Sequence, residues 1–170
     1  MRTKHVIVEA YDPKWNTEFE KIASELSQIL GAAAIAIEHV GSTSVPGLSA
    51  KPIIDLDVVV QNDNLSHVIS ILEEHGYIHE GDLGITGREA FAYTQKEHLM
   101  LHHLYVCPQN SPELYRHLTF RNWLRSHPED VAVYSRIKEE GAQRYPLDID
   151  AYCEYKAPVI AEIYAKCGLL

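Results

Sequence analysis

Hydrophobic positions in the first third of the chain follow two different periods. From Asp12 onward, apolar residues recur three or four positions apart, which is the spacing of one helix face. These residues are Trp15, Phe19, Ile22, Leu26 and Leu30. Asp12 and Pro13 are typical helix-start residues, and Gly31 ends the pattern. Short stretches rich in Val, Ile and Ala predict three strands, at 5–9, 33–40 and 53–60.

The period changes twice more along the rest of the chain. Residues 65–75 predict a second helix, which Gly76 closes, and two paired strands follow at 90–94 and 99–106 with a turn at 95–98. Beyond residue 110 the pattern is helical. Three helix starts are predicted, at Ser111-Pro112-Glu113, at Pro128-Glu129-Asp130, and at Asp148 or Asp150. Aromatic and aliphatic residues at helical spacing are expected to pack this half against itself and against the sheet: Phe120, Trp123, Leu124, Val131, Tyr134 and Ile137.

These elements predict an α/β (α+β) fold with a short mixed sheet in the front half and helices behind it. A chain of 170 residues with 46% hydrophobic and 23% charged residues is expected to form a single domain over residues 1–170. A net charge of -9 argues against a broad nucleic-acid surface. No stretch predicts a membrane span or a signal peptide, so we expect a cytoplasmic protein; the oligomeric state is left open.

The segment PIIDLDVVV places two carboxylates inside a hydrophobic strand. Asp55 and Asp57 are two positions apart, so both point from one face while their apolar neighbours cover the other. An Asp-x-Asp pair is often solvated, but burying charge beside such a core is costly unless it is compensated. A divalent cation, Mg²⁺ or alternatively Mn²⁺, would relieve the repulsion. The preceding turn, Gly41-Ser42-Thr43-Ser44, offers small residues and donors for an anion.

An apolar-Gly-Ser segment followed by Asp-x-Asp resembles the nucleotidyltransferase superfamily. Five blocks of sequence are similar to the GrpB-like family: YDPKW, IEHVGSTSVPGLSAKPIIDLDVVV, HHLYVC, FRNWLRSHPEDVAVYSRIK and the pair Tyr152 and Lys156. The resemblance covers almost the whole chain and implies a nucleotidyltransferase-type fold. It gives Gly41 and Ser42 a phosphate-binding role, and it gives Asp55 and Asp57 a metal-binding role.

One residue that the resemblance implies is missing. Active nucleotidyltransferases commonly carry a third carboxylate on a later strand. The matching strand here, LMLHHLYVC, has none. Only one of His102 and His103 can face the aspartates, and the family pattern favours His103. His103 would then be a general base or a metal ligand, or else a hydrogen-bonded structural histidine. A transition-metal site that combines His39, His98 or His103 with the aspartates is a further alternative.

Three cations are candidates for binding phosphate. Lys51 lies just before the aspartate strand, where it would meet a phosphate or pair with Asp55. Arg121 and Arg125 share a helix face and are suited to grip an anion, although helix arginines are more often solvated or paired with acids. Tyr152 and Lys156 also share a face and form either a site edge or a surface pair.

The sequence therefore leads to two hypotheses. The first is a metal-dependent nucleotidyltransferase with catalytic Asp55, Asp57 and His103, which transfers a nucleotide from a nucleoside triphosphate to a small-molecule acceptor. The second is a non-catalytic module that binds a nucleotide or another anion. A link to coenzyme A metabolism fits the second hypothesis, because some GrpB-like sequences resemble a domain attached to dephospho-coenzyme A kinase.

Overall fold

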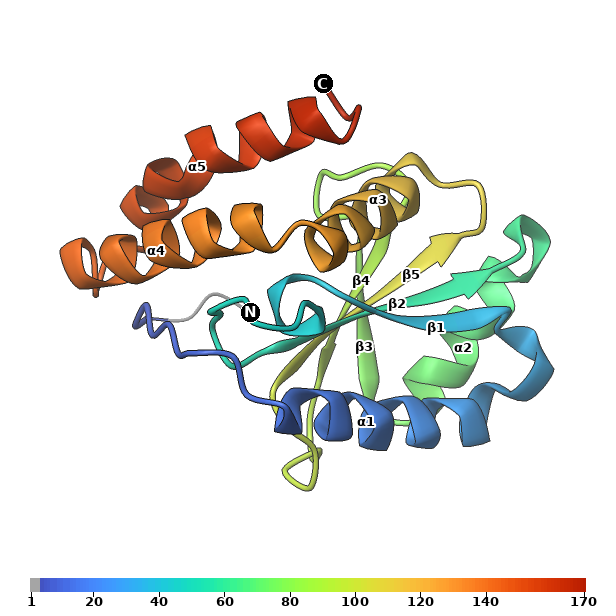
Figure 1. Cartoon of the computed structure of the whole chain (residues 1–170). Helices are drawn as coiled ribbons and strands as arrows, with labels where there is room; N and C mark the ends of the chain where they lie inside the picture. Colours follow the sequence, from blue (N-terminus) through green and yellow to red (C-terminus); the bar gives the residue numbers. More distant parts are fainter. Residues whose placement is uncertain (1–3) are drawn as a thin grey trace.

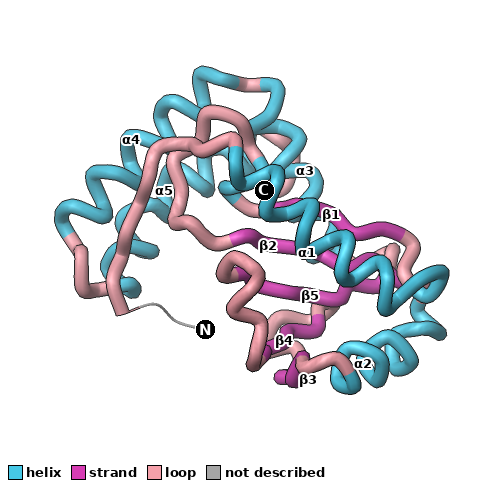
Figure 2. The backbone as a smooth tube through the Cα atoms, turned by 90° about the horizontal axis from the view of Figure 1, so that it is seen from below, coloured by secondary structure: helices cyan, strands magenta, loops and turns pink. Residues whose placement is uncertain are grey.

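The computed structural model describes residues 4–170, which fold around one mixed sheet of five strands (Figure 1). The strands are β1 (Ala36–Val40), β2 (Ile54–Val60), β3 (Tyr77–Gly81), β4 (Glu89–Tyr93) and β5 (His102–Pro108). Their spatial order is β1-β2-β5-β4-β3, which can be followed in Figure 2. β2 and β5 run parallel at the centre, and every other neighbouring pair is antiparallel.

Helices cover both faces of this sheet (Figure 1). They are α1 (Lys14–Leu30), α2 (Leu65–Glu74), α3 (Pro112–Ser126), α4 (Pro128–Arg144) and α5 (Ile149–Lys166). α1 and α2 pack on one face, where Ile54, Leu56 and Val58 of β2 are fully buried among their side chains. The opposite face carries Asp55 and Asp57, so the alternation predicted for this strand is confirmed.

The three C-terminal helices lie on the aspartate side of the sheet, with α4 and α5 packed side by side (Figure 1). A separate hydrophobic cluster joins these helices to the loop between β1 and β2; its buried members are Val45, Leu48, Leu124, Val131, Tyr134 and Ile163. Phe120 and Trp123 pack against the same cluster, as expected from their helical spacing. The cluster thus fixes the loop that carries the Gly41–Ser44 turn.

The helix starts follow from local side-chain chemistry. Ser111 accepts a hydrogen bond from the backbone N–H of Leu114 and begins α3. Asp148 accepts one from Ala151 and begins α5, which resolves the choice between Asp148 and Asp150. At α1 the carboxylate of Asp12 accepts from the N–H of Lys14, the first residue of the helix, so Asp12 caps α1 from two residues before its start.

Two strand predictions were wrong. Residues 5–9 do not form a strand; only Glu9 makes an isolated bridge, with Ala50. β3 was missed, because its sequence YIHEG is short, half polar and interrupted by a bulge between His79 and Gly81. The antiparallel pairing of β4 with β5 is confirmed, although β5 begins at His102 rather than at residue 99. None of the helices in the part that the structure describes is long and apolar enough to span a bilayer.

Candidate active site

The turn after β1 brings the backbone against the first aspartate. Gly41 has φ +71°, a left-handed conformation that favours glycine. A Cβ atom at this position would collide with Oδ2 of Asp55 and lie 2.9 Å from its Cγ. Only glycine therefore lets the chain pass so close to the carboxylate, and the short helical turn Ser42–Ser44 starts directly beside it. The sequence predicted this turn correctly, and the contact explains why it needs glycine.

Each aspartate of β2 is paired with a histidine on a different element. Nδ1 of His103 lies 2.9 Å from Oδ1 of Asp55, across the parallel pairing of β2 with β5. Nδ1 of His117, on α3, lies 2.6 Å from Oδ2 of Asp57. With an ionised carboxylate as partner, Nδ1 must carry the proton in each pair. The face assignment of His103 is therefore confirmed, while His102 points to the other face and bonds the hydroxyl of Tyr77.

The two aspartates differ sharply in burial. The side chain of Asp55 is 30% exposed, whereas that of Asp57 is completely buried. Burial raises the pKa of Asp57, although the hydrogen bond and the charge of His117 act in the opposite direction. Burial would lower the pKa of His117, but the hydrogen bond to Asp57 and the negative charges of Asp57, Glu113 and Asp55 together outweigh it, so the net shift is upward. Asp55 therefore faces ligand space, and Asp57 lies beneath it in a buried ion pair.

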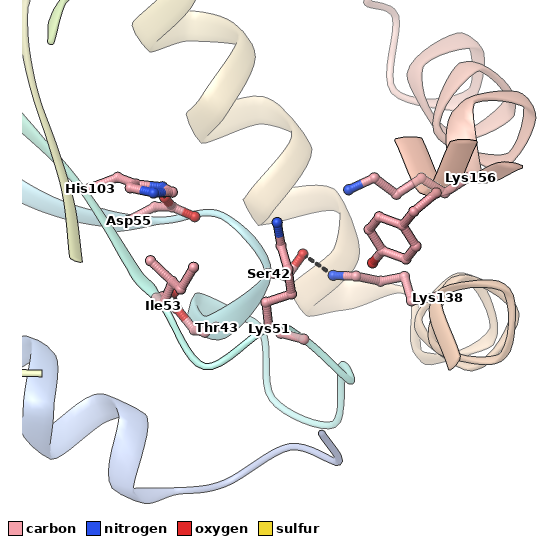
Figure 3. Close-up of a pocket in the computed structure, with 10 residues that line it drawn as sticks. Ser42, Thr43, Lys51, Ile53, Asp55, His103, Lys138 and Lys156 are labelled. Carbon is pink, nitrogen blue, oxygen red and sulfur yellow. Dashed lines mark hydrogen bonds and ion pairs between the residues drawn. The ribbon is translucent and has the colours of Figure 1, made fainter. Parts of the chain in front are cut away.

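A cavity of about 200 Å³ opens beside Asp55 (Figure 3). Asp55 and His103 lie along one side, and Ser42 and Thr43 lie at the turn. Three lysines point into the same space from three elements: Lys51 before β2, Lys138 on α4 and Lys156 on α5. None of these three ammonium groups forms an ion pair with a carboxylate within residues 4–170. The cavity therefore carries an excess of positive charge in a protein whose net charge is -9.

Lys138 is the most buried of the three lysines, with 3% of its surface exposed. Its ammonium donates a hydrogen bond to Oγ of Ser42 and lies 4.8 Å from the ring centre of Tyr134. Burial lowers its pKa well below the ordinary value, and the charges of Lys156 and Lys51 act in the same direction. Burial also lowers the pKa of Lys156. Such groups are costly to charge without an anion nearby.

The unsatisfied polar atoms of the protein gather at this region. Among residues 4–170, three buried side-chain atoms have no hydrogen-bond partner: Asp57 Oδ1, Arg88 Nε and Tyr152 Oη. Tyr152 lines the cavity and lies under Lys156, whose ammonium is 4.8 Å from its ring centre. Native proteins satisfy most buried polar atoms, and the exceptions call for an explanation. Their concentration around the aspartates indicates groups that await a ligand.

Several predicted site residues have structural partners instead. Arg121 binds Oε2 of Glu38 at 2.7 Å and the carbonyl of His39, while Nε of Arg125 donates to the carbonyl of Ser44. Neither arginine lines the cavity. Ser44 is also turned away, because its hydroxyl donates to the carbonyl of Gly41. These three residues stabilise the turn. Their positions outside the cavity do not support the anion-binding role predicted for them.

The alternative transition-metal site does not assemble. Nε2 of His39 lies 3.0 Å from Oγ1 of Thr43, its ring stacks on Phe19, and burial lowers its pKa to about 4. His98 pairs with Glu25 of α1, far from the aspartates in the fold. In the described part of the chain, no three His, Cys, Asp or Glu side chains form a group suited to hold a metal ion.

Magnesium requires fewer protein ligands than the transition-metal site considered above. It commonly takes one or two carboxylates and completes its coordination with water and substrate phosphates. Each aspartate offers one oxygen without a hydrogen-bond partner, Oδ2 of Asp55 and the orphaned Oδ1 of Asp57. The residues present therefore fit a magnesium ion that is shared with a phosphate-bearing ligand.

Sequence reasoning missed three members of the site. Glu38 lies opposite Asp57 in the β1–β2 register and is a third carboxylate on this face, although Arg121 holds it. His117 and Lys138 reach the site from helices that follow β2 by more than fifty residues. A lysine inside the apolar pattern of α4 was a visible signal for Lys138. No local motif pointed to His117.

The sheet, the glycine turn and the paired aspartates define a nucleotidyltransferase-type fold. The poly(U) polymerase Cid1 in complex with its short product ApU aligns with a TM-score of 0.53 at 14% identity, over 75% of this chain and 40% of that one. Such low identity supports the fold alone. The GrpB protein family model matches residues 5–166, and the chain belongs to that family.

Relatives of the family are similar over most of this chain. The crystal structure of GrpB from Enterococcus faecalis aligns with a TM-score of 0.79 and 36% identity, over 94% of this chain and 98% of that one. UPF0157 protein YqkA of Bacillus subtilis is 35% identical over 86% of the chain, and UPF0157 protein PA4798 of Pseudomonas aeruginosa is 37% identical over 91%. The chain spans 42% and 64% of the length of these two curated relatives.

Proposed function

We propose that the chain is a magnesium-dependent nucleotidyltransferase that moves a nucleotide from a nucleoside triphosphate to a hydroxyl of a small molecule. The observation that carries this proposal is the cavity in which Asp55 and His103 face three lysines without acidic partners. An anionic chain between those walls would pair with the lysines, and a magnesium ion would be needed to hold it beside the carboxylate of Asp55. Cid1, which shares the fold, is named as a poly(U) polymerase, and nucleotide transfer is the reaction we propose for this chain on the basis of its own cavity.

The cavity has the size of a phosphate chain rather than of a whole nucleotide. Sites that enclose a drug-sized ligand measure roughly 300–1,000 Å³, and this one measures about 200 Å³. Lys51, Lys138 and Lys156 would hold the phosphates, and the hydroxyls of Ser42 and Tyr152 would donate to their oxygens. The base and sugar would then lie outside the cavity.

His103 has the geometry of a general base. Asp55 holds Nδ1–H, so the neutral ring has its lone pair on Nε2, in a residue that lines the cavity. In the proposed reaction Nε2 takes the proton of the acceptor hydroxyl, whose oxygen bonds to the α-phosphorus as pyrophosphate leaves. Magnesium, when bound, would neutralise the charge of the phosphates. A histidine in this role removes the need for a third carboxylate.

The test begins with nucleotide binding. Thermal shifts with each nucleoside triphosphate, with and without Mg²⁺, should show stabilisation that Asp55→Asn and Lys156→Met abolish. Lys21→Met is the matched control, because Lys21 is exposed on α1, outside the cavity, and pairs with Glu18. Pyrophosphate release is then measured while a library of hydroxylated metabolites is screened as acceptors. If no nucleoside triphosphate changes the melting temperature, the proposal is wrong.

A second function is favoured by the β5 sequence, because His103 and Tyr105 stand where a catalytic carboxylate is common. The chain would then be a non-catalytic module that binds a nucleotide or a related anion. A protein named dephospho-CoA kinase, of Mycolicibacterium paratuberculosis, is 26% identical over 91% of this chain, which spans 44% of that protein. This likeness suggests coenzyme A metabolism as a setting. Nucleotide binding without pyrophosphate release for any acceptor would favour the module.

A further inference from the structure

Arg88 is a cation with no polar partner, held close to the aspartates. It forms no hydrogen bond or ion pair with any residue between 4 and 170, and its Nε atom is buried. Its guanidinium lies 4.3 Å from the ring centre of Tyr105 on β5. A guanidinium is planar, and an aromatic ring beneath it holds its position. Its N–H groups are then available to bind a planar or tetrahedral oxyanion.

The backbone around Arg88 is fixed by a contact with the start of α3. Gly87 has φ +91°, and its carbonyl accepts a hydrogen bond from the hydroxyl of Ser111. Ser111 also accepts from Leu114, so one side chain ties α3 to the residue before Arg88. The position of Arg88 is therefore built into the fold, unlike that of an arginine on a free surface loop.

Asp57 does not satisfy Arg88. The positive charge of Arg88 acts on this carboxylate and opposes the increase in pKa that burial causes. Even so, Oδ1 of Asp57 and Nε of Arg88 are both buried and both without partners, so the two groups do not bond to each other. A purely structural counter-ion would be expected to pair with the charge it neutralises.

Tyr105 links Arg88 to the proposed base. The rings of Tyr105 and His103 are 6.4 Å apart on the same face of β5, and Nδ1 of His103 lies 2.9 Å from Oδ1 of Asp55. The lysine cavity includes Asp55 and His103 but neither Arg88 nor Tyr105. Two cationic regions therefore flank His103, one with three lysines and one with a single stacked arginine.

We infer that Arg88 and Tyr105 form a second subsite, which binds a carboxylate or phosphate group of the acceptor. The acceptor is thus an anionic hydroxyl compound that lies along Tyr105, with its hydroxyl toward His103 and its oxyanion on the guanidinium. The assignment of this bound anion to an acceptor molecule rests on the proposed nucleotidyl transfer. The anion subsite itself rests only on Arg88, Tyr105 and their surroundings.

The test follows the Arg88 Nε–Hε signal in ¹⁵N NMR spectra of the whole chain. Tripolyphosphate first saturates the lysine cavity, and the protein is then titrated with inorganic phosphate in one arm and with succinate in the other. The Arg88 signal, assigned from Arg88→Lys, should shift and saturate in at least one arm, which identifies the class of oxyanion. The signal of Arg136, which is exposed on α4 and pairs with Glu140, should not move.

Calorimetry under the same conditions gives the affinity change. Arg88→Gln should weaken binding of the effective anion about tenfold or more, because a hydrogen-bonded ion pair is lost. Arg136→Gln should leave binding unchanged. Equal affinity in Arg88→Gln, or no saturable shift of the Arg88 signal in either arm, would overturn the inference. Failure of tripolyphosphate to bind, with the Arg88 shift intact, would instead remove the proposed function and leave the subsite.

Discussion

Lys138 shows how the cost of burying one charge can be tested directly. Its ammonium is almost completely buried, and its only polar partner among the described residues is the hydroxyl of Ser42. In the unfolded chain a lysine has a pKa of about 10.4, whereas burial lowers the pKa of Lys138 well below that value in the folded state. The unfolded chain therefore binds more protons between these two pKa values.

This difference in proton binding determines how the free energy of unfolding changes with pH. Where the unfolded state binds more protons, the free energy of unfolding rises with pH, by at most about 1.4 kcal/mol per pH unit for one group. Lys138→Met removes this group. The unfolding free energy of the native chain, measured by urea denaturation without ligand from pH 6 to 9, should therefore rise relative to that of Lys138→Met. Lys21→Met is the control and should run parallel to the native chain. Parallel curves for Lys138→Met would contradict the assignment.

His103 separates chemistry from binding. If Nε2 is the base, His103→Asn should reduce pyrophosphate release by about 100-fold or more, while nucleotide affinity changes little. Steady-state kinetics and calorimetry on the same preparations provide the two readings. Loss of nucleotide affinity together with activity would place His103 in the binding or metal site instead.

The residues that sequence could locate are those joined by a local motif. Gly41 and Ser42 share a turn, and Asp55 and Asp57 share one strand face, so spacing alone placed them. Lys138 and His117 act on the same site from α4 and α3, at sequence separations of 96 residues from Ser42 and 60 from Asp57. Such contacts depend on how the helical half docks, which no short pattern records.

The turn between β1 and β2 is the element on which the site depends most. Gly41 and Gly31 both have positive φ, of 71° and 51°, but only Gly41 has a close neighbour at the Cβ position. The two glycines therefore provide a matched pair of substitutions, because both carry backbone strain and one also carries a collision with Asp55.

Gly41→Ala should push Asp55 out of place, whereas Gly31→Ala should only strain its backbone. We expect Gly31→Ala to destabilise the fold by about 1–2 kcal/mol and to leave nucleotide binding unchanged. Gly41→Ala should cost more stability and should also weaken Mg²⁺-dependent nucleotide binding about tenfold or more. Thermal denaturation and a nucleotide titration of both variants measure the difference. Equal binding by the two variants would show that the Gly41–Asp55 contact is irrelevant to the ligand.

Elements with one strong period were predicted well, and weakly patterned ones were not. α1 carries a continuous apolar stripe, and its predicted extent agrees with Lys14–Leu30 within a residue. β3 has a short, half-exposed sequence and owes its pairing to β4, so its own pattern could not identify it. Residues 5–9 have strand composition but find only one bridge, since no neighbouring strand extends beside them.

At the scale of the whole molecule, the cavity lies between two separately packed parts. One wall comes from the sheet and its turn, and the other from α4 and α5. Apart from the hydrophobic cluster around Val45 and Leu48, polar contacts connect these parts. The hydroxyl of Ser49 donates a hydrogen bond to Glu139 of α4 at 2.6 Å. The backbone N–H of Ser49 donates another to the hydroxyl of Ser135, also on α4. An anion bound by Ser42 and the three lysines would add a further link between the two parts.

A bound phosphate chain should therefore protect α4 and α5 against local opening. At a ligand concentration 100 times its Kd, binding stabilises the closed form by about 2.7 kcal/mol, which slows hydrogen exchange through openings that release the ligand about 100-fold. We expect tripolyphosphate with Mg²⁺ to slow exchange in α4 and α5 more than in α1 and α2, which pack on the other sheet face. Hydrogen exchange with mass spectrometry gives both readings in one experiment.

The variants decide whether this protection comes from the lysines. Lys51→Met combined with Lys156→Met should remove it, because two of the three cations that bridge the parts are then lost. Lys21→Met changes the net charge on the opposite face and should leave the protection intact. Equal slowing in all five helices would mean that they open together, and the bridging role of the anion would then be wrong. Slowing confined to α4 and α5 would instead show that the ligand fastens the helical half to the sheet.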